Sequence, residues 1–339
     1  MVCHDDLVPP ESIKGRSDKE ISEWRTEFDV LSTLRDLEYD AEVLGVGEDV
    51  DAIREALREF KPHVCFNLMI EFHGAGNYDQ HIASYFELHR QPYTGCNPRG
   101  LTLARDKGLS KKILEWHGLS VPKFGVFPMD RGTKRLRRPE HLEYPLFVKS
   151  LNEEASLGIS RKSIVKTDKQ LEQRVKYIHE KVGSDAIAEE YIEGREFYIG
   201  ILGNKRLETL PLWELNIPNL PVGEPRIATR KLKWDIGYQR TMEVKNHRAK
   251  GLSDKLEADI AHAAKGVYRA LGLSGFARLD IRMRPDGSFF FLEANPNPDL
   301  TYGEDFAESA EAAGISYETL IERIVDLGAR YPVEWKRNS

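Results

Sequence analysis

The sequence predicts a mixed α/β fold built from more than one domain, and three observations support this prediction. The first hundred residues alternate strand-like and helix-like segments, a pattern typical of βαβ units around a parallel sheet. The chain has 339 residues, which at about 100–200 residues per domain is enough for two or three domains. Towards the C-terminus, two segments of alternating polarity flank Asp286-Gly287, a strong signal for an antiparallel hairpin. We therefore expect an α/β domain at the N-terminus, followed by domains of α+β character.

Composition and charge exclude several classes of protein. Lys and Arg total 49 against 55 Asp and Glu, so the net charge is −6, which argues against a general nucleic-acid binder. No apolar stretch approaches the roughly 20 residues that span a bilayer, and residues 1–10 lack the basic start and apolar core of a signal peptide. The 3 cysteines are widely spaced, so they form neither a disulfide framework nor a CxxC metal site. We expect a soluble cytoplasmic protein without nucleic-acid or membrane partners.

The N-terminal segments follow one another in βαβ order. Residues 17–20 have the form of a capping box, and apolar residues continue at helical spacing as far as Leu34. Only Val2 and Cys3 precede the first loop, so the first strand is expected to be unusually short. The other elements expected in this part are strands at 41–46 and 64–69 and helices at 49–60 and 79–89.

From about residue 98 the pattern changes and no longer follows a simple βαβ order. The elements expected next are a helix at 103–117, a strand at 145–149, a polar loop at 150–158, a strand at 159–165, a helix at 168–181 and a strand at 186–191. The remainder is expected to contain a strand pair around Gly203, an irregular segment at 214–250, a helix at 253–271, the hairpin at 276–294 and helices at 304–313 and 316–329. We place the domain boundaries near residues 97 and 190, which divides the chain into 1–97, 98–190 and 191–335.

The hairpin is predicted to bring two carboxylates together. A two-residue type I′ turn at Asp286-Gly287 would pair the flanking residues so that Asp280 lies opposite Glu293. Two opposed carboxylates repel each other unless a cation lies between them. The register of the turn therefore predicts a site for a cation on this face.

Two further polar side chains share that face because side chains alternate along a strand. Arg278 lies two residues before Asp280, and Asn295 lies two residues after Glu293. Oxygen ligands beside an arginine suit Mg²⁺ bound to a polyphosphate. The alternative is an exposed hairpin face with an incidental Arg–Asp pair.

This hairpin resembles that of the ATP-grasp superfamily, and within it the D-alanine–D-alanine ligases. In that group one strand carries R-x-D and the next carries E-x-N. The resemblance implies an ATP-grasp fold with a Rossmann-like N-terminal domain. It implies that Asp280, Glu293 and Asn295 hold two Mg²⁺ ions, or Mn²⁺ in their place, on the phosphates of ATP. Arg278 is implied to stabilise charge on the reacting groups.

Three more segments resemble the same family in the same order, so that the resemblance covers residues from about 64 to 330. Asp106 to Lys111 matches the D-K-x-x-x-K helix, which implies that Lys107 contacts ATP phosphates. PLFVKSLNEEASLGIS at 145–160 matches a strand–loop–strand unit in which Lys149 contacts the α- and β-phosphates and Ser156 the γ-phosphate. AIAEEYIEGREFYIGILG at 186–203 matches the hinge, with Glu189 and the Ile192 backbone implied at adenine and Glu196 at ribose.

Each of these residues also has an ordinary explanation. Lys107 could be a solvated helix lysine, Lys149 an edge lysine and Glu196 an exposed strand residue. Their joint occurrence in the family's order favours the resemblance.

The resemblance implies a ligase that joins a carboxylic acid to an amine through an acyl phosphate formed from ATP. Its mobile loop implies a lysine on the γ-phosphate, either Lys231 or Lys233, and the KLKWD context favours Lys233. Amino acids or small peptides are the implied substrates, and a homodimer is implied because dimers are common in this group.

The sequence departs from the family where the second substrate should bind. The family's E-x-N-T-x-P-G run is here EANPNPD, so Asp299 stands in place of the glycine. Glu304 and Asp305 fall near the position of a serine that receives a substrate carboxylate. Acidic side chains there would repel a carboxylate and favour an amine or a cationic group.

The N-terminal substrate loop is also changed. EFHGAGNYDQ at 71–80 keeps the family's His-Gly pair, but Tyr78 occupies the position of an expected acidic residue. Glu71, His73 and Asp79 are therefore candidate substrate contacts, and polar residues of a surface loop are the alternative.

We predict an ATP-dependent carboxylate–amine ligase whose second substrate is not D-alanine. Two alternatives remain open: an ATP-grasp enzyme that modifies a peptide or protein end, and a nucleotide-binding regulator without turnover.

Overall fold

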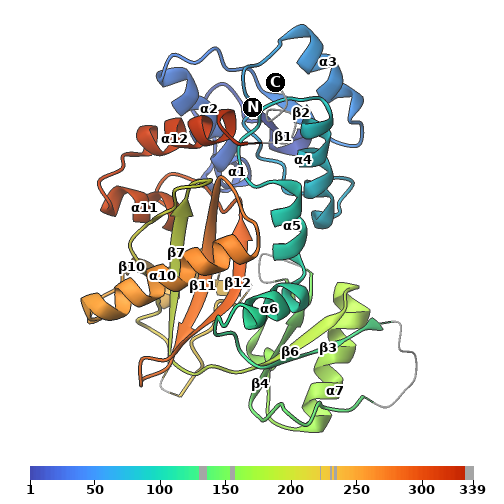
Figure 1. Ribbon diagram of the computed structural model, residues 1–339, viewed down its shortest axis with the longest axis vertical. Helices are drawn as coiled ribbons and strands as arrows, with labels where there is room; N and C mark the ends of the chain where they lie inside the picture. Colours follow the sequence, from blue (N-terminus) through green and yellow to red (C-terminus); the bar gives the residue numbers. More distant parts are fainter. Residues whose placement is uncertain (130–135, 153–156, 222, 230, 233–234, 333–339) are drawn as a thin grey trace.

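The computed structural model describes residues 1–129, 136–152, 157–221, 223–229, 231–232 and 235–332. The described residues form three sheets with helices around them (Figure 1). In that part of the chain, no helix is both long enough and apolar enough to cross a membrane. The domain boundaries near residues 97 and 190 stay a prediction.

The N-terminal part is built around two short parallel strands, β1 (Val2–His4) and β2 (Leu44–Val46). The first strand is short, as predicted. The predicted strand at 64–69 is an extended segment that runs alongside β1, since Val2 N–H donates to Phe66 O at 2.8 Å and Leu68 N–H donates to Val2 O at 2.9 Å. It forms only isolated bridges and is not a named strand. The helices here are α1 (Asp18–Glu23), α2 (Arg25–Asp36), α3 (Asp51–Glu59) and α4 (Asp79–Leu88).

Two long helices predicted from the sequence are each divided in two. The capping box at Ser17 and Glu20 is confirmed, but α1 ends at Trp24, whose φ of −131° and ψ of 23° depart from helical values. The helix predicted at 103–117 is divided at Asp106 into α5 (Pro98–Arg105) and α6 (Lys107–Trp116). The Asp106 backbone is extended there, and its carboxylate accepts hydrogen bonds from the first free N–H groups of α6. Apolar spacing continues through both breaks, which explains why the pattern alone did not reveal them.

The central sheet is antiparallel, with strand order β3-β6-β4-β5. Its strands are β3 (Phe124–Phe127), β4 (Leu146–Ser150), β5 (Ile164–Val165) and β6 (Ala186–Glu190). Helix α7 (Asp168–Tyr177), capped by Thr167, packs its buried Leu171 and Val175 on this sheet. The predicted strand at 159–165 survives only as β5, because a 3-10 turn capped by Ser160 precedes it.

The C-terminal sheet has the order β10-β9-β7-β11-β12, and β8 pairs with the far end of β7. Its strands are β7 (Arg195–Leu202), β8 (Glu208–Thr209), β9 (Trp213–Asn216), β10 (Lys245–Arg248), β11 (Phe276–Met283) and β12 (Phe289–Pro296). The segment predicted to be irregular therefore contains β9 and β10, and the short helix α9 (Ile236–Met242) lies between them.

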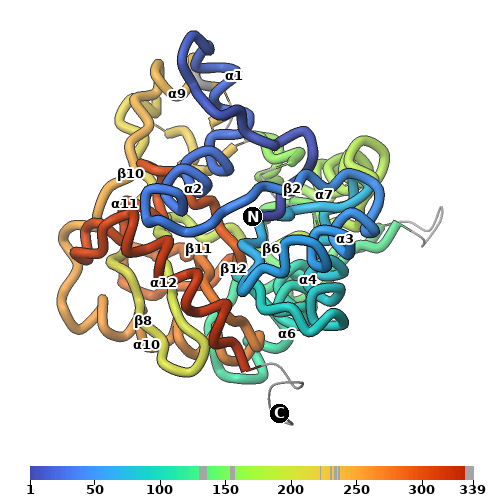
Figure 2. Tube along the Cα trace, turned by 90° about the horizontal axis from the view of Figure 1, so that it is seen from above, coloured from blue at the N-terminus to red at the C-terminus, as the bar shows by residue number. Residues whose placement is uncertain are grey.

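Helices cover both faces of the C-terminal sheet. Helix α10 (Asp254–Ala270) packs against one face, and α11 (Asp305–Ala312) and α12 (Tyr317–Ala329) lie on the other. Helix α12 also packs against α2 of the N-terminal part, and both views show these two helices side by side (Figure 2). The last helix therefore ties the C-terminal sheet to the start of the chain.

The turn of the β11–β12 hairpin differs from the predicted one. Its loop has three residues, 285–287, closed by Arg284 N–H donating to Ser288 O at 2.8 Å, and Gly287 takes a φ of +87°. The prediction of a two-residue type I′ turn was therefore wrong. A bulge at Leu292 adds one residue to β12, and the pairing of Asp280 with Glu293 is restored beyond it. The prediction that Asp280 lies opposite Glu293 is therefore confirmed, because the bulge compensates for the longer turn.

Gly194 allows the chain to turn between β6 and β7. Its φ is +146°, and a Cβ atom there would lie 2.0 Å from the Met283 carbonyl oxygen. Gly314 has a φ of +81° but no atom near the position of a Cβ. An alanine at this position would therefore strain the backbone without a steric clash.

We expect Gly194→Ala to lower the free energy of unfolding by about 3 kcal/mol or more, and Gly314→Ala by about 1–2 kcal/mol. Urea unfolding followed by circular dichroism measures both. Equal losses in the two variants would contradict the close approach of β11 to Gly194.

Candidate active site

A cleft lies between the central and C-terminal sheets. Strands and loops of both sheets contribute its lining residues, which are Phe147, Lys149, Ile159, Glu189, Glu190, Tyr191, Ile192, Glu196, Ile227, Ala228, Asp280, Arg282, Leu292 and Glu293. The cleft joins an apolar end to a strongly charged end.

The apolar end is lined by aliphatic and aromatic side chains, among them Phe147, Ile159 and Ile227. The Ile192 N–H beside them has no hydrogen-bond partner among the described residues, whereas the Ile192 carbonyl accepts from Arg282 at 2.9 Å. An apolar slot with one open backbone donor suits an aromatic ring that carries a nitrogen acceptor. This geometry is compatible with the predicted role of Ile192 at adenine.

Arg282 is a cleft residue that the sequence did not point to. It is 4% exposed, and it donates to Glu196 Oε2 at 2.8 and 3.1 Å, to the Ile192 carbonyl and to the Arg226 carbonyl. Tyr198 O–H donates to the other carboxylate oxygen of Glu196 at 3.1 Å. Burial disfavours the charge on Arg282, but Glu196 outweighs that effect and raises its pKa. Strand alternation could have found Arg282, which lies two residues after Asp280 on the same strand.

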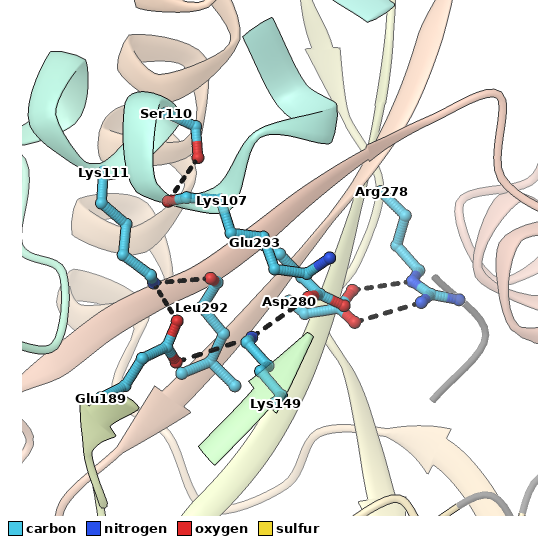
Figure 3. A network of polar contacts seen from close by, with 9 residues as sticks. All are labelled: Lys107, Ser110, Lys111, Lys149, Glu189, Arg278, Asp280, Leu292 and Glu293. Atoms are coloured by element: carbon cyan, nitrogen blue, oxygen red, sulfur yellow. Dashed lines mark hydrogen bonds and ion pairs between the residues drawn. The ribbon is translucent and has the colours of Figure 1, made fainter. Parts of the chain in front are cut away.

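The charged end brings together residues predicted from distant segments (Figure 3). Lys149 Nζ lies 3.2 Å from Glu293 Oε2 and 3.5 Å from Glu189 Oε2. Burial disfavours the Lys149 ammonium, but the carboxylates of Glu189 and Glu293 outweigh burial and raise its pKa. Lys149 is therefore neither a solvated nor an incidental edge lysine.

Arg278 and Asp280 form a second ion pair at this end. The guanidinium contacts both carboxylate oxygens, at 2.9 and 3.1 Å, and lies 4.7 Å above the Tyr198 ring. Burial opposes the Arg278 charge, but Asp280 outweighs burial and raises its pKa, with a further contribution from Asp305. The pair is bidentate, the strong geometry for an arginine and a carboxylate.

Helix α6 supplies two lysines from one face. Lys107 is 5% exposed and Lys111 is 1% exposed, one turn further along. Lys111 Nζ donates to the Leu292 carbonyl at 2.7 Å and lies 3.3 Å from Glu189 Oε1. Burial lowers the pKa of Lys111 to about 8, although Glu189 acts in the opposite direction. A role was predicted for Lys107 alone, and the second lysine of the D-K-x-x-x-K motif is the signal that could have identified Lys111.

The donor set at the hairpin fits a hard divalent cation. Asp280 and Glu293 are directly paired across the hairpin, and Asn295 is paired with Arg278. Asn295 Nδ2 is buried without a hydrogen-bond partner among the described residues. Two carboxylates and a carboxamide oxygen are ligands that Mg²⁺ accepts.

The N-terminal candidates lie outside the residues that line this cleft. Asp79 is buried and pairs with Arg105, so its carboxylate already has a structural partner. Glu71 Oε1 lies 3.8 Å from His4 Nε2, and the exposed His73 packs its ring 4.4 Å from that of Phe72. Substrate contact by Glu71 and His73 stays a prediction.

Two predicted residues, Ser156 and Lys233, lie outside the described residues. The alternative to Lys233, Lys231, is exposed, and its ammonium lies 4.3 Å from the centre of the Tyr238 ring. The roles predicted for the mobile loop therefore stay predictions.

An acidic patch lies beyond Arg278, where α2 meets the segment that leads into α11. We define it as Glu27, Asp29, Asp299, Glu304 and Asp305. Asp299 Oδ1 accepts from Thr26 O–H at 3.0 Å, and Asp29 Oδ2 accepts from Tyr302 N–H at 3.0 Å. These bonds dock the segment on α2, so the patch combines residues from opposite ends of the chain.

Several carboxyl groups of the patch are poorly neutralised. Burial raises the pKa of Glu27 to about 7, with a further contribution from Asp299. Glu304 is exposed by surface area, yet the protein around its carboxyl group, together with Asp299 and Asp305, raises its pKa to about 7. Asp305 accepts a hydrogen bond from Asn246 at 2.6 Å. The acidic groups around Glu304 and Asp305 are therefore more numerous than the sequence suggested, because α2 adds Glu27 and Asp29 to them.

Comparison with known proteins gives consistent matches. Residues 113–326 match the family model described as D-ala D-ala ligase C-terminus. An uncharacterized protein of Sinorhizobium fredii is 32% identical over 74% of this chain and 70% of its own length. The D-alanine–D-alanine ligase of Carboxydothermus hydrogenoformans is 32% identical over 76% of this chain and 80% of its own length. The structure of D-alanine–D-alanine ligase from Bacillus anthracis complexed with ATP matches with a TM-score of 0.72 at 23% identity, over 97% of this chain and 96% of that chain.

The two facing sheets and the cleft between them define an ATP-grasp fold, as predicted. The chain belongs to the D-alanine–D-alanine ligase family, whose members are ATP-dependent ligases that form peptide bonds.

Glu27 tests the electrostatics of the acidic patch. Its pKa is raised from 4.5 to about 7, so the stability that its protonated form contributes is complete below pH 4.5 and is lost as the pH rises through 7. We compare the unfolding free energy of Glu27→Gln with that of wild type at pH 5 and at pH 8. We expect the difference to change by about 2–3 kcal/mol in favour of the variant as the pH rises from 5 to 8. Urea unfolding at both pH values measures this gain, with Glu23→Gln on exposed α1 as the matched control. A difference from wild type that does not change with pH would show that Glu27 titrates normally.

Proposed function

We propose that the protein is an ATP-dependent carboxylate–amine ligase that forms an amide or peptide bond through an acyl phosphate. The observation that carries this proposal is the junction of the apolar slot with the charged end of one cleft. Lys149, Asp280 and Glu293 line the charged end, which is proposed to receive the phosphates of a nucleotide. Amino acids or small peptides are the proposed substrates.

The chain's own residues would bind and orient the nucleotide. Ile192, which lines the slot, is proposed to offer its N–H to adenine, and Glu196, held by Arg282, is proposed to accept from the ribose hydroxyls. Lys107 and Lys149 are the proposed partners of the phosphates. Asp280, Glu293 and Asn295 would hold Mg²⁺, which supplies neutralisation of phosphate charge when bound.

Arg278 is proposed to act on the reacting carboxylate. Its guanidinium has N–H donors beyond the two that pair with Asp280, and these could donate to oxygens on which negative charge develops. The carboxylate would attack the γ-phosphoryl group of ATP with release of ADP, and the amine would then displace phosphate from the resulting acyl phosphate. Positioning carries most of the catalysis in such reactions, because the protein forms no covalent bond itself.

The second substrate is proposed to carry an amine without a nearby carboxylate. Glu304 and Asp305 stand at the start of α11, and Asp305 is close enough to Arg278 and Tyr198 to affect their pKa values. A carboxylate that approached this helix would meet two like charges. The cytoplasmic location and the homodimer stay predictions.

The function is tested by ADP release with Mg²⁺ and ATP across a panel of amino acids, small peptides and amines. We expect stimulation by at least one carboxylate–amine pair. Glu293→Gln should reduce that rate by about 100-fold or more without loss of folding, because it removes a charged metal ligand. Glu115→Gln, on the exposed side of α6, is the matched control. ATP binding without stimulated ADP from any pair would contradict the ligase and favour a regulator.

The acidic patch is tested through selectivity among amines. Because the pKa of Glu304 is about 7, its charge develops between pH 6 and pH 8. Discrimination against carboxylate-bearing amines, measured as a ratio of kcat/KM values, should therefore rise over that range. We expect Glu304→Gln to reduce the discrimination at pH 8 by about tenfold, which corresponds to about 1.4 kcal/mol. Glu311→Gln, exposed on the same helix, should keep the wild-type pH trend. An unchanged trend in Glu304→Gln would exclude this role.

A further inference from the structure

We propose that Lys111 is a positioning residue that keeps Glu189 neutralised, so that Lys149 is free to move to the nucleotide phosphates. This inference rests on the proposed function, because it concerns binding of the nucleotide in the same cleft. Lys111 itself would contact neither the nucleotide nor the metal ions.

The position of Lys111 is tightly defined by three elements. Its side chain comes from α6, its ammonium donates to the Leu292 carbonyl of β12 at 2.7 Å, and it lies 3.3 Å from Glu189 of β6 (Figure 3). Lys111 is 1% exposed and Glu189 is 2% exposed. Neither group can exchange its partner for bulk water without movement of the surrounding sheets.

Glu189 is shared between two lysines. Its Oε1 faces Lys111 at 3.3 Å and its Oε2 faces Lys149 at 3.5 Å. Lys149 in turn lies 3.2 Å from Glu293. Lys149 therefore has two carboxylate partners in this structure, and both must release it when it binds phosphate.

The two partners release Lys149 by different means. Glu293 is a proposed metal ligand, so a divalent cation would replace Lys149 as its counter-charge. Among the described residues, Lys111 is the other cation beside Glu189 and can take this place. A buried carboxylate left without a cation is strongly unfavourable. Without Lys111, Glu189 would hold Lys149 and keep it from the phosphates.

The Leu292 carbonyl explains why Lys111 stays with Glu189. Leu292 is the bulged residue of β12, and a bulge leaves ladder groups unpaired. Lys111 satisfies this carbonyl and is anchored by it. The ammonium is thereby held beside Glu189 and away from the open part of the cleft.

The test measures binding of Mg²⁺ with the non-hydrolysable analogue AMP-PNP, by isothermal titration calorimetry. We expect Lys111→Met to weaken this binding by at least tenfold, while binding of adenosine, which has no phosphate, changes by less than threefold. Lys112→Met, on the exposed side of the same turn, should bind like wild type. In a folded Lys111→Met variant, equal weakening of adenosine and of the Mg²⁺ complex would overturn the inference.

A double variant separates the charge effect from other consequences. In the Lys111→Met background, Glu189→Gln removes the charge that retains Lys149, so binding of the Mg²⁺ complex should return to within threefold of the Glu189→Gln single variant. A further loss beyond that single variant would overturn the inference. The same comparison decides the matter if Lys111→Met alone does not fold.

The wild-type titration distinguishes this inference from the proposed function. If wild type does not bind Mg²⁺–AMP-PNP, that result contradicts both the proposed function and the inference. If wild type and Lys111→Met bind it equally well, that result contradicts the inference alone.

Discussion

The neutralisation of buried carboxylates between the two facing sheets is the constraint on which the site depends. Glu189 and Asp280 are 2% and 4% exposed, and an unpaired charge at such depth costs several kcal/mol. Lysines from α6 and β4 and an arginine from β11 meet this requirement. The cations therefore hold the central sheet, the C-terminal sheet and α6 in one arrangement, and that arrangement forms the cleft.

The hairpin shows how local irregularity serves this constraint. A three-residue turn shifts the pairing near Met283 and Phe289 by one position, and the bulge at Leu292 shifts it back. Without the bulge, Glu293 would face away from Asp280, because a one-residue slip moves a side chain to the other face. The bulge also presents the carbonyl that anchors Lys111. Turn, bulge and buried lysine form one unit of structure.

The acidic patch is a second region of unfavourable electrostatics, near Arg278. Here carboxyl groups of α2 and of the segment before α11 gather with few counter-charges, and the pKa values of Glu27 and Glu304 rise to about 7. Proteins tolerate such unfavourable electrostatics mainly where function requires it. The hydrogen bond between Thr26 and Asp299 makes the N-terminal helix part of this region. A cleft rich in paired charges is thus combined with an acidic region that has few counter-charges.

Much of the fold and the polar face of the β11–β12 hairpin could be predicted because they depend on local pattern. Strand alternation places Arg278 with Asp280 and Glu293 with Asn295, and family motifs identified Lys149. The break between α1 and α2 at Trp24 was not predicted, because the apolar spacing continues through it. A period of 3.6 residues reports which face is buried and says nothing about where the backbone departs from helical values.

The sequence by itself determined the fold class, the family and the hairpin residues, because neighbours along a strand have a fixed geometric relation. Only the tertiary structure decided that Lys111 faces Glu189, that Arg282 holds Glu196 and that Glu27 joins the acidic patch. These contacts link residues far apart in the chain, across sheets and helices whose packing no local pattern specifies. Their physical origin is burial: once the sheets meet, each charged side chain must have a partner, and the partner is whichever group the packing brings within reach.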